Sequence, residues 1–259
     1  MTLKDNERVD RVNDDLELIQ KTDGLTFGTD ALLLAGYARR GARLGAELGA
    51  GSGIISMLLL SRNKCERIYA FEVQKEYAEL VSRNAELNSL SERLFPVPLD
   101  IREAGGEHRE RYDAVFTNPP YMRADSGRQN EVSAKNIARH EIFGTIGDFA
   151  KAGARLLKYG GSFLAVYRPD RLADLTVALR EAGLEIKRLT FVHADAEARP
   201  SMLLLEAKRG ARSGMAVTRP LIIYRDGTHR EYTRDMIYID ESGSFPRDFY
   251  TANGGRNED

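Results

Sequence analysis

Apolar runs of strand length alternate, after about residue 40, with longer stretches whose apolar residues recur at helical spacing. Strands that alternate with helices in this way typically form a mostly parallel sheet with helices on both faces. The pattern therefore predicts an α/β protein. Its seven strands are expected at residues 44–48, 67–72, 95–99, 112–117, 162–167, 185–192 and 202–208, and its helices at 53–63, 75–87, 149–157 and 169–182.

Glycine and proline mark two of the expected helix boundaries. Gly160 and Gly161 are expected to end the helix that begins near Phe149, because glycine often follows the last turn of a helix. Pro169 suits the first turn of the next helix, where its missing N–H is tolerated.

The expected strands also divide the chain into three parts. A core at residues 43–208 contains the whole alternating pattern. Residues 1–42 precede it, and we expect this N-terminal segment to pack on the ligand site of the core. Residues 209–259 follow it as a C-terminal extension, whose last six residues are expected to form a mobile tail.

Composition narrows the class of protein. A chain of 259 residues with 42% hydrophobic and 30% charged residues can bury a substantial core, and a formal net charge of −1 gives no general sign of nucleic-acid binding. The single cysteine, Cys65, cannot form an internal disulfide, which fits a reducing compartment. The polar N-terminus does not resemble a signal peptide, and no run reaches the roughly 18 apolar residues of a membrane span. We therefore expect a cytoplasmic protein with no membrane partner.

A glycine-rich segment, Glu-Leu-Gly-Ala-Gly-Ser-Gly at residues 47–53, lies between the first expected strand and helix. Glycine allows tight turns and close approach of a ligand to the backbone. Open α/β sheets bind ligands beyond the carboxyl ends of their strands. The G-x-G-x-G spacing differs from the G-x-G-x-x-G of nicotinamide enzymes. The candidate ligand contacts in this segment are Glu47, Gly49, Gly51 and Gly53.

Acidic residues follow the next two strands. Glu72 closes the second strand, where a carboxylate can accept hydrogen bonds from both hydroxyls of a ribose. Asp100 follows the third strand and could accept from the amino group of an adenine. A carboxylate at a strand end is also a common helix cap. The glycine loop and both acids in this order favour a nucleoside site, to which the adjacent Val73 and Ile101 would contribute apolar contacts.

The segment Asn118-Pro119-Pro120-Tyr121 follows the fourth expected strand. Two prolines alone would make a rigid turn. The Asn118 side-chain oxygen and the Pro119 carbonyl can also accept both N–H groups of an amino group, which would aim its lone pair at an electrophilic methyl group. Tyr121 offers a flat face for a planar substrate. We take Asn118, Pro119 and Tyr121 as catalytic candidates, and Asn118 also as a cofactor contact.

Asn-Pro-Pro-Tyr after such a glycine loop resembles the class I methyltransferases that use S-adenosylmethionine and act on exocyclic or amide nitrogens. Over roughly residues 7–240 the chain is similar to the bacterial adenine-N6 methyltransferases that modify adenine 37 of valine tRNA. This resemblance implies a Rossmann-like sheet of seven strands with the last one antiparallel, S-adenosylmethionine as cofactor and tRNA as partner. The further segments that carry it are Arg8-Val9-Asp10, Ile19-Gln20, Phe27–Leu34, Ala138-Arg139-His140-Glu141, Pro220–Tyr224 and Glu231-Tyr232-Thr233.

The resemblance also implies that Phe27, Thr29 and Asp30 lie beside the methionine end of the cofactor and the target base. A helix start capped by Thr29 or Asp30 would explain the same residues, and the two interpretations are compatible. For the Arg-His-Glu triplet at residues 139–141, ordering of the loop after Tyr121 or a phosphate contact is favoured over base catalysis.

Two other enzyme classes stay open, which methylate a protein glutamine or guanine N2 of ribosomal RNA, and so does one non-enzymatic role. Glutamine methyltransferases of release factors share the four-residue motif but carry a longer helical region before the glycine loop. DNA adenine methyltransferases usually have Asp in place of Asn118 and a separate recognition domain. Ribosomal RNA guanine-N2 methyltransferases are closer and often have Phe in place of Tyr121. An RNA-binding module with a degenerate methyltransferase fold is disfavoured by the intact Glu72, Asp100 and Asn118.

Charge is unevenly distributed along the chain. Residues 1–30 carry four basic and eight acidic side chains, whereas residues 207–234 carry seven basic and two acidic ones. Such a stretch beside the site would suit RNA phosphates, although a solvated surface explains it too. His193 and His229 lack metal-ligand spacing, so we expect no metal, and we expect a monomer with the oligomeric state left open. The basic residues are Lys208, Arg209, Arg212, Arg219, Arg225, Arg230 and Arg234, with Arg123 and Arg128 after Tyr121.

Overall fold

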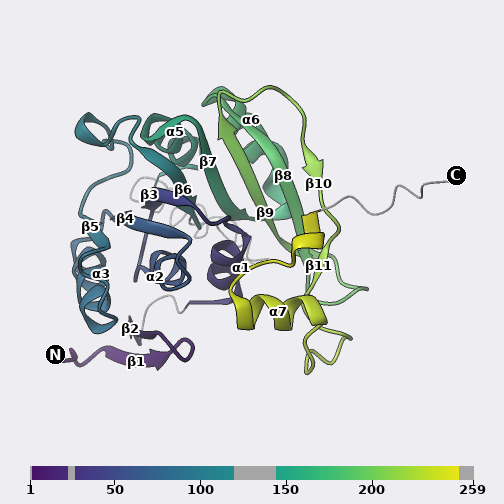
Figure 1. Ribbon diagram of the computed structural model, residues 1–259, viewed down its shortest axis with the longest axis horizontal. Coiled ribbons are helices and arrows are strands. Elements are labelled where there is room, and N and C mark those ends of the chain that lie inside the picture. The colour runs from purple at the N-terminus through teal and green to yellow at the C-terminus, as the bar shows by residue number, and fades with distance from the viewer. Residues whose placement is uncertain (1, 23–26, 120–143, 251–259) are drawn as a thin grey trace, which may run out of the picture.

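The computed structural model describes residues 2–22, 27–119 and 144–250 and shows a central sheet with helices on both faces (Figure 1). Within these ranges the sheet has nine strands in the order β10-β8-β9-β7-β6-β3-β4-β5, and β11 also pairs with β8. The strands are β3 (Ala42–Leu48), β4 (Cys65–Phe71), β5 (Leu94–Val97), β6 (Tyr112–Thr117), β7 (Leu157–Tyr167), β8 (Leu184–His193), β9 (Pro200–Arg209), β10 (Ala216–Val217) and β11 (Leu221–Ile222).

Two hydrophobic cores lie on opposite faces of this sheet. Side chains alternate along a strand, so that Ala114 and Phe116 of β6 belong to one core and Val115 to the other. The first core contains residues of α1 (Thr29–Tyr37), α2 (Ile54–Ser61), α3 (Lys75–Leu87) and α7 (Arg234–Ser242), and the second contains residues of α5 (Ile146–Leu156) and α6 (Leu172–Glu181). Short 3-10 turns are η1 (Gly106–His108), η2 (Pro169–Arg171) and η3 (Arg247–Tyr250).

The predicted core topology is confirmed. Seven strands run in the order β5-β4-β3-β6-β7-β9-β8, and β9, the last of them, is antiparallel to both of its neighbours. The pattern placed α3 and β6 at the residues where they occur. The carboxyl ends of the parallel strands therefore meet at one edge of the sheet, where ligand sites form in such folds.

The prediction that Gly160 and Gly161 end a helix is wrong. Helix α5 ends at Leu156, and β7 begins at the next residue and runs through both glycines. Gly160 has a φ of +79°, and a Cβ on Gly161 would lie 3.2 Å from the backbone oxygen of Asp113 in β6. These glycines therefore permit a twisted start of β7 close to β6.

Strands outside the predicted core come from both ends of the chain. The C-terminal extension contributes β10 and β11, which pair in parallel with β8 and widen the sheet. The N-terminal segment forms a separate hairpin of β1 (Glu7–Arg11) and β2 (Glu17–Lys21). No described helix combines the length and apolarity needed to cross a membrane.

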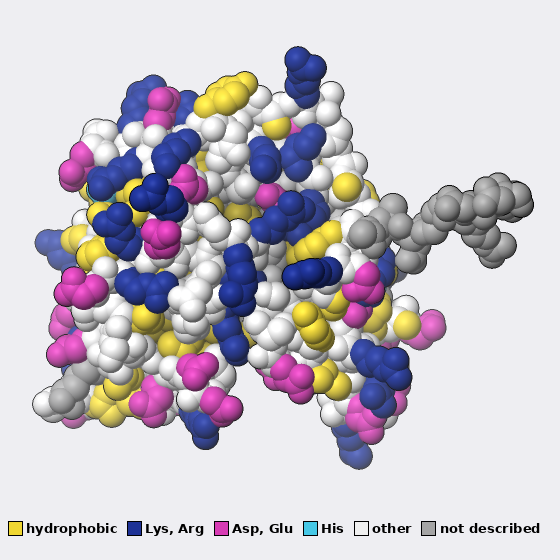
Figure 2. Space-filling view, in the orientation of Figure 1, with side chains coloured by type: hydrophobic (Ala, Val, Ile, Leu, Met, Phe, Trp, Pro, Cys, Tyr) yellow, Lys and Arg dark blue, Asp and Glu magenta, His cyan; other side chains and the backbone are white. Residues whose placement is uncertain are grey.

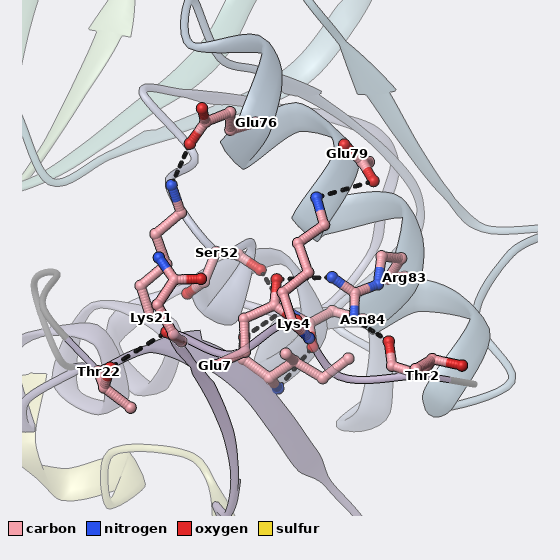
Figure 3. A network of polar contacts seen from close by, with 12 residues as sticks. Thr2, Lys4, Glu7, Lys21, Thr22, Ser52, Glu76, Glu79, Arg83 and Asn84 are labelled. Carbon is pink, nitrogen blue, oxygen red and sulfur yellow. Dashed lines mark hydrogen bonds and ion pairs between the residues drawn. The ribbon is translucent and has the colours of Figure 1, made fainter.

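The N-terminal hairpin is held against α3 by polar contacts (Figure 3). Asn84 of α3 is fully buried, and its amide exchanges hydrogen bonds of 2.7 and 3.0 Å with the backbone of Ile19 in β2. The same amide donates to the backbone oxygen of Ser52 at 2.9 Å. One side chain thus joins the hairpin to the glycine loop. Ion pairs around it are Lys4–Glu79, Glu7–Arg83 and Lys21–Glu76.

The C-terminal extension packs against α1 and against strand β8 of the sheet. A Cβ on Gly36 of α1 would lie 3.2 Å from Ile239 of α7, so these segments touch closely. Arg188 of β8 is 4% exposed and forms an ion pair of 3.0 Å with Glu206 of β9. Its guanidinium also lies 3.8 Å and 4.0 Å from the ring centroids of Tyr37 and Tyr250. Arg188 thereby joins core and extension.

Candidate active site

The glycine loop follows β3 at the carboxyl edge of the sheet. Gly49, Gly51 and Gly53 have φ values of +70°, +54° and +83°, a region that glycine enters without strain. A Cβ on Gly51 would meet no atom within 4 Å, so the backbone there faces open space. A Cβ on Gly53 would lie 3.2 Å from Val81 of α3. Gly51 therefore leaves room for a ligand, while Gly53 allows close helix packing.

Glu72 lies at the end of β4, against the glycine loop. One carboxylate oxygen accepts a hydrogen bond of 2.9 Å from the Gly51 N–H, and the other accepts one of 2.9 Å from the Gln74 N–H. Each oxygen has two lone pairs, so the carboxylate retains acceptors for the hydroxyls of a ribose. Val73, 37% exposed, adds an apolar surface next to it.

Asp100 follows β5 and is held by Arg102. Its carboxylate accepts hydrogen bonds of 2.9 Å from the Arg102 backbone N–H and of 2.9 and 3.0 Å from the Arg102 Nε. These bonds lower the pKa of Asp100, which therefore stays charged. An adenine amine would have to share this carboxylate with Arg102. The neighbouring Ile101 is buried in the core.

Glu47 lies beneath the glycine loop and is 1% exposed. One of its oxygens accepts from the backbone N–H of Ser56 at 3.0 Å and from the Ser56 hydroxyl. Burial raises the pKa of Glu47 to about 8, so the carboxyl is largely protonated at neutral pH. Glu47 thus stabilises the first turn of α2, and a direct cofactor contact stays a prediction.

Asn118 and Pro119 follow β6 next to the glycine loop. The Thr117 hydroxyl donates to the backbone oxygen of Leu48 at 2.9 Å, which ties the end of β6 to the end of β3. Asn118 is half-buried and Pro119 is buried. The catalytic candidate Tyr121, with Pro120 and the triplet at 139–141, lies outside the described residues.

The start of α1 lies beside Asn118. Asp30 accepts a hydrogen bond of 2.6 Å from the Asn118 Nδ2, across 88 positions of sequence. The interpretation of Thr29 or Asp30 as the N-cap residue is wrong, because Gly28 occupies that position, and the Asp30 carboxylate instead accepts a hydrogen bond of 3.0 Å from the Ala31 N–H within the first turn. Phe27 is half-buried, and its N–H donates to the Gln20 side chain at 3.3 Å.

The opposite end of α1 is held by two buried cations that the sequence did not indicate. Lys64 is 2% exposed, and its ammonium donates three hydrogen bonds to carbonyls of the last turn of α1 and its C-cap residue. Arg188 donates to the carbonyl of Tyr37 at 3.0 Å. A lysine among polar residues between a helix and a strand gives no signal of such burial. The carbonyls bound by Lys64 are those of Ala35, Gly36 and Ala38, at 2.8, 2.7 and 2.8 Å.

Metal ligands are not grouped anywhere in the part of the chain that the structure describes, where no three His, Cys, Asp or Glu side chains could hold an ion. The His193 Nδ1 lies 2.8 Å from the carbonyl of Ala198. The His229 Nε2 lies 3.0 Å from the Asp195 carboxylate. Neither of these contacts therefore belongs to a set of metal ligands.

Comparison with known proteins identifies the family. A family model for the methyltransferase small domain matches residues 21–177, more than half of the chain. The chain belongs to this methyltransferase family. The family resemblance, the enzyme class and the Rossmann-like fold expected from the sequence are thereby confirmed.

Individual relatives agree with this assignment. The methyltransferase is 29% identical to the tRNA1(Val) (adenine(37)-N6)-methyltransferase of Dyadobacter fermentans, over 81% of this chain and 87% of the relative. It is 30% identical to the protein of the same name from Phocaeicola vulgatus, over 71% of this chain and 77% of the relative. The crystal structure of a predicted O-methyltransferase from Agrobacterium tumefaciens is 24% identical, with a TM-score of 0.67 over 84% of this chain and 98% of that one, and supports the fold alone.

Proposed function

We propose that this methyltransferase transfers a methyl group from S-adenosylmethionine to N6 of an adenine in tRNA, with adenine 37 of valine tRNA as the substrate. The observation that carries the chemistry is the position of Asn118 and Pro119 at the end of β6, beside the glycine loop. The curated relatives named above support the choice of substrate. Because tRNA is the substrate, we place the reaction in the cytoplasm.

The glycine loop and its surroundings fit S-adenosylmethionine. The bare backbone at Gly51 accommodates a ligand, and Glu72 presents acceptors for ribose hydroxyls. Val73 offers an apolar surface beside them. When bound, the cofactor supplies an electrophilic methyl group on a positively charged sulfur.

The methyltransferase then has to activate a weak nucleophile. The lone pair of an exocyclic amine is delocalised into the base, which slows its attack. The Asn118 Nδ2 is directed at Asp30, so its side-chain oxygen is the group that can accept from the amine, and the Pro119 carbonyl is the second acceptor. Binding both N–H groups favours a pyramidal nitrogen with its lone pair exposed. No strong base is needed beforehand, because the proton becomes acidic only after the N–C bond forms.

An adenine in an anticodon loop suits a small enzyme, since it is single-stranded and its extrusion requires little energy. RNA binding by this methyltransferase has to depend on local groups of cations. Basic and acidic side chains are interspersed over the face shown in Figure 2, consistent with the formal net charge of −1.

The basic stretch at residues 207–234 is divided between the two ends of β8. Arg209 pairs with Leu184 at the amino end of β8 and forms an ion pair of 2.7 Å with Glu110. Leu221 and Ile222 of β11 pair with the carboxyl end of β8, so the residues that follow lie at the edge that carries Asn118. We propose that this carboxyl-edge segment, residues 223–234, contacts the RNA.

An aromatic stack in the carboxyl-edge segment supports this proposal. The ring of Tyr224 stacks with the rings of His229 and Tyr232, with centroids 4.9 and 5.2 Å away and interplanar angles of 25° and 26°. Tyr232 is 39% exposed. Stacked rings beside arginines are typical of surfaces that bind single-stranded nucleic acid.

Asn118→Ala tests the proposed reaction. Loss of the acceptor should lower methyl transfer to tRNA by about 10²–10³-fold, a magnitude typical of removing one positioned hydrogen-bonding group, with affinity for S-adenosylmethionine within about threefold. The measurements are transfer of labelled methyl groups to total tRNA and calorimetric titration with the cofactor. Transfer at the wild-type rate would overturn the mechanism.

Nucleoside mass spectrometry of tRNA from cells with and without the gene tests the substrate. Loss of N6-methyladenosine from valine tRNA is the expected result. Loss of N2-methylguanosine from ribosomal RNA, or of methylglutamine from a release factor, would instead identify one of the alternative substrates.

A further inference from the structure

In the contact between Asp30 and Asn118, the amide nitrogen of Asn118 donates and the Asp30 carboxylate accepts. A side-chain amide can take two orientations that exchange its oxygen and its nitrogen, and only one of them presents the oxygen to a substrate amine. The Asp30 carboxylate lies 2.6 Å from the Asn118 Nδ2 and can only accept hydrogen bonds. In the reversed orientation, two oxygens with partial or full negative charge would face each other at that distance. Asp30 therefore selects the orientation in which the Asn118 oxygen points away from it.

We propose that Asp30 is a positioning residue that holds the Asn118 amide with its oxygen toward the amino group to be methylated. This inference rests on the proposed function, in which the Asn118 oxygen accepts from the substrate amine. Asp30 acts through Asn118 and need not touch the substrate. Its effect is to keep the acceptor oriented before the substrate arrives, which is how preorganised sites lower a barrier.

The Asp30 carboxylate is itself held in place. Its second oxygen accepts a hydrogen bond of 3.0 Å from the Ala31 N–H in the first turn of α1. A carboxylate at a helix N-terminus is also stabilised by the helix dipole. A Cβ at position 28 would lie 2.9 Å from that oxygen, so Gly28 leaves the space that the carboxylate occupies.

The position of Asp30 is further determined by the anchoring of α1. Lys64 and Arg188 bind four carbonyls at the opposite end of this nine-residue helix. Both cations are buried, at 2% and 4% exposure, and Arg188 is additionally paired with Glu206. The helix that carries Asp30 is therefore fixed by the protein core, independently of Asn118.

The family resemblance suggests a different role, in which Asp30 contacts the methionine end of the cofactor. The two roles differ in the quantity that depends on Asp30. A cofactor contact would change the affinity for S-adenosylmethionine and leave kcat at saturation nearly unchanged. A positioning role would lower kcat and leave that affinity nearly unchanged.

Exchange of donor and acceptor distinguishes these roles. Asn118→Asp alone places two carboxylates in contact, and we expect it to lower kcat by at least about 100-fold. The double variant Asp30→Asn/Asn118→Asp restores a complementary pair, because the amide at position 30 donates to the carboxylate at 118, whose other oxygen can accept from the substrate. We expect the double variant to exceed Asn118→Asp at least tenfold in kcat. A role of Asp30 confined to folding would not produce this recovery.

Single variants at position 30 complete the test. Asp30→Ala should lower kcat by about 10–100-fold, with the dissociation constant for S-adenosylmethionine within threefold of wild type. Asp30→Asn should retain more activity than Asp30→Ala, because its amide oxygen can still accept from Asn118. Asp174→Asn is the matched control, since Asp174 also lies in the first turn of a helix, and it should leave kcat unchanged.

Methyl transfer is measured with labelled S-adenosylmethionine and total RNA, and the acceptor nucleoside is identified separately. The pairing test therefore stays valid if the acceptor is an RNA nucleotide other than adenine, which would contradict only the proposed substrate. A double variant no more active than Asn118→Asp would overturn the positioning role. So would an Asp30→Ala variant that loses cofactor affinity at unchanged kcat.

Discussion

Glu47 illustrates how burial changes the chemistry of a single residue under the glycine loop. Its carboxyl is 1% exposed, and burial raises its pKa to about 8 from the value of 4.5 for a free group. A carboxyl whose pKa is raised by folding stabilises the folded protein in its protonated form. That stabilisation is fully present below pH 4.5 and is lost as the pH rises through 8.

Glu47→Gln should therefore become more stable relative to wild type as the pH rises from 5 to 8. The difference in unfolding free energy should grow by up to about 1.4 kcal/mol per pH unit, the value for one proton bound differently by the two states. Urea denaturation at several pH values measures it. Glu86→Gln, at an exposed position of α3, should not show this trend. Parallel pH profiles for wild type and Glu47→Gln would contradict the burial of an ionisable group at this position.

Residues with local signals could be assigned from the sequence, whereas their tertiary partners could not. Gly51 and Glu72 follow predictable strands, so their meeting at one edge of the sheet follows from topology. The partnership of Asp30 with Asn118 spans 88 positions and depends on where α1 packs. Lys64 has no neighbouring acid in sequence that suggests burial, because its partners are backbone carbonyls.

Helix α1 is the element on which the active site depends most. It begins beside Asn118, and at its carboxyl end the Lys64 ammonium binds two carbonyls of the helix and that of its C-cap residue. Burial lowers the pKa of Lys64 to about 7, whereas carbonyls at the negative end of the helix dipole favour its charged form. Without this side chain, three buried acceptors would lose their donor.

Lys64→Met should destabilise the protein by about 2–4 kcal/mol, because the cost of unsatisfied buried carbonyls exceeds the gain from an apolar side chain of similar length. Chemical denaturation provides the measurement. Lys151→Met, at an exposed position of α5, is the control and should change stability by less than about 0.5 kcal/mol. Equal stability of the two variants would show that Lys64 does not anchor α1.

Elements differed in how far the sequence pattern determined them. The amphipathic repeat of α3 and the apolar run of β6 are strong enough to set their boundaries. Glycines such as Gly160 and Gly161 occur both at helix ends and at irregular positions in strands, so the sequence pattern could not tell which of the two structures forms here. The strands β10 and β11 have two residues each, which is too few for a periodic pattern, and they form by pairing with β8.

At the scale of the whole molecule, basic residues from one stretch of the sequence are divided between the edge formed by the amino ends of the parallel strands and the edge formed by their carboxyl ends. Arg209 is paired with the start of β8 and Ile222 with its end, and a strand of ten residues spans roughly 30 Å. Only the carboxyl edge carries the glycine loop and Asn118. We therefore expect an RNA whose base enters the active site to contact the carboxyl-edge segment.

Replacing Arg225, Arg230 and Arg234 together by Ala should weaken binding of valine tRNA by about tenfold or more. Three fewer cations near phosphates should also reduce the slope of log affinity against log salt by about 2. Fluorescence anisotropy with labelled tRNA at several salt concentrations measures both quantities. The double variant Arg209→Ala/Arg212→Ala removes cations from the same basic stretch at the amino edge, and it should leave affinity within about twofold. If instead the amino-edge variant lost affinity and salt dependence while the carboxyl-edge variant kept them, the tRNA would lie across the opposite edge of the sheet, and its base could not reach Asn118 in the proposed way.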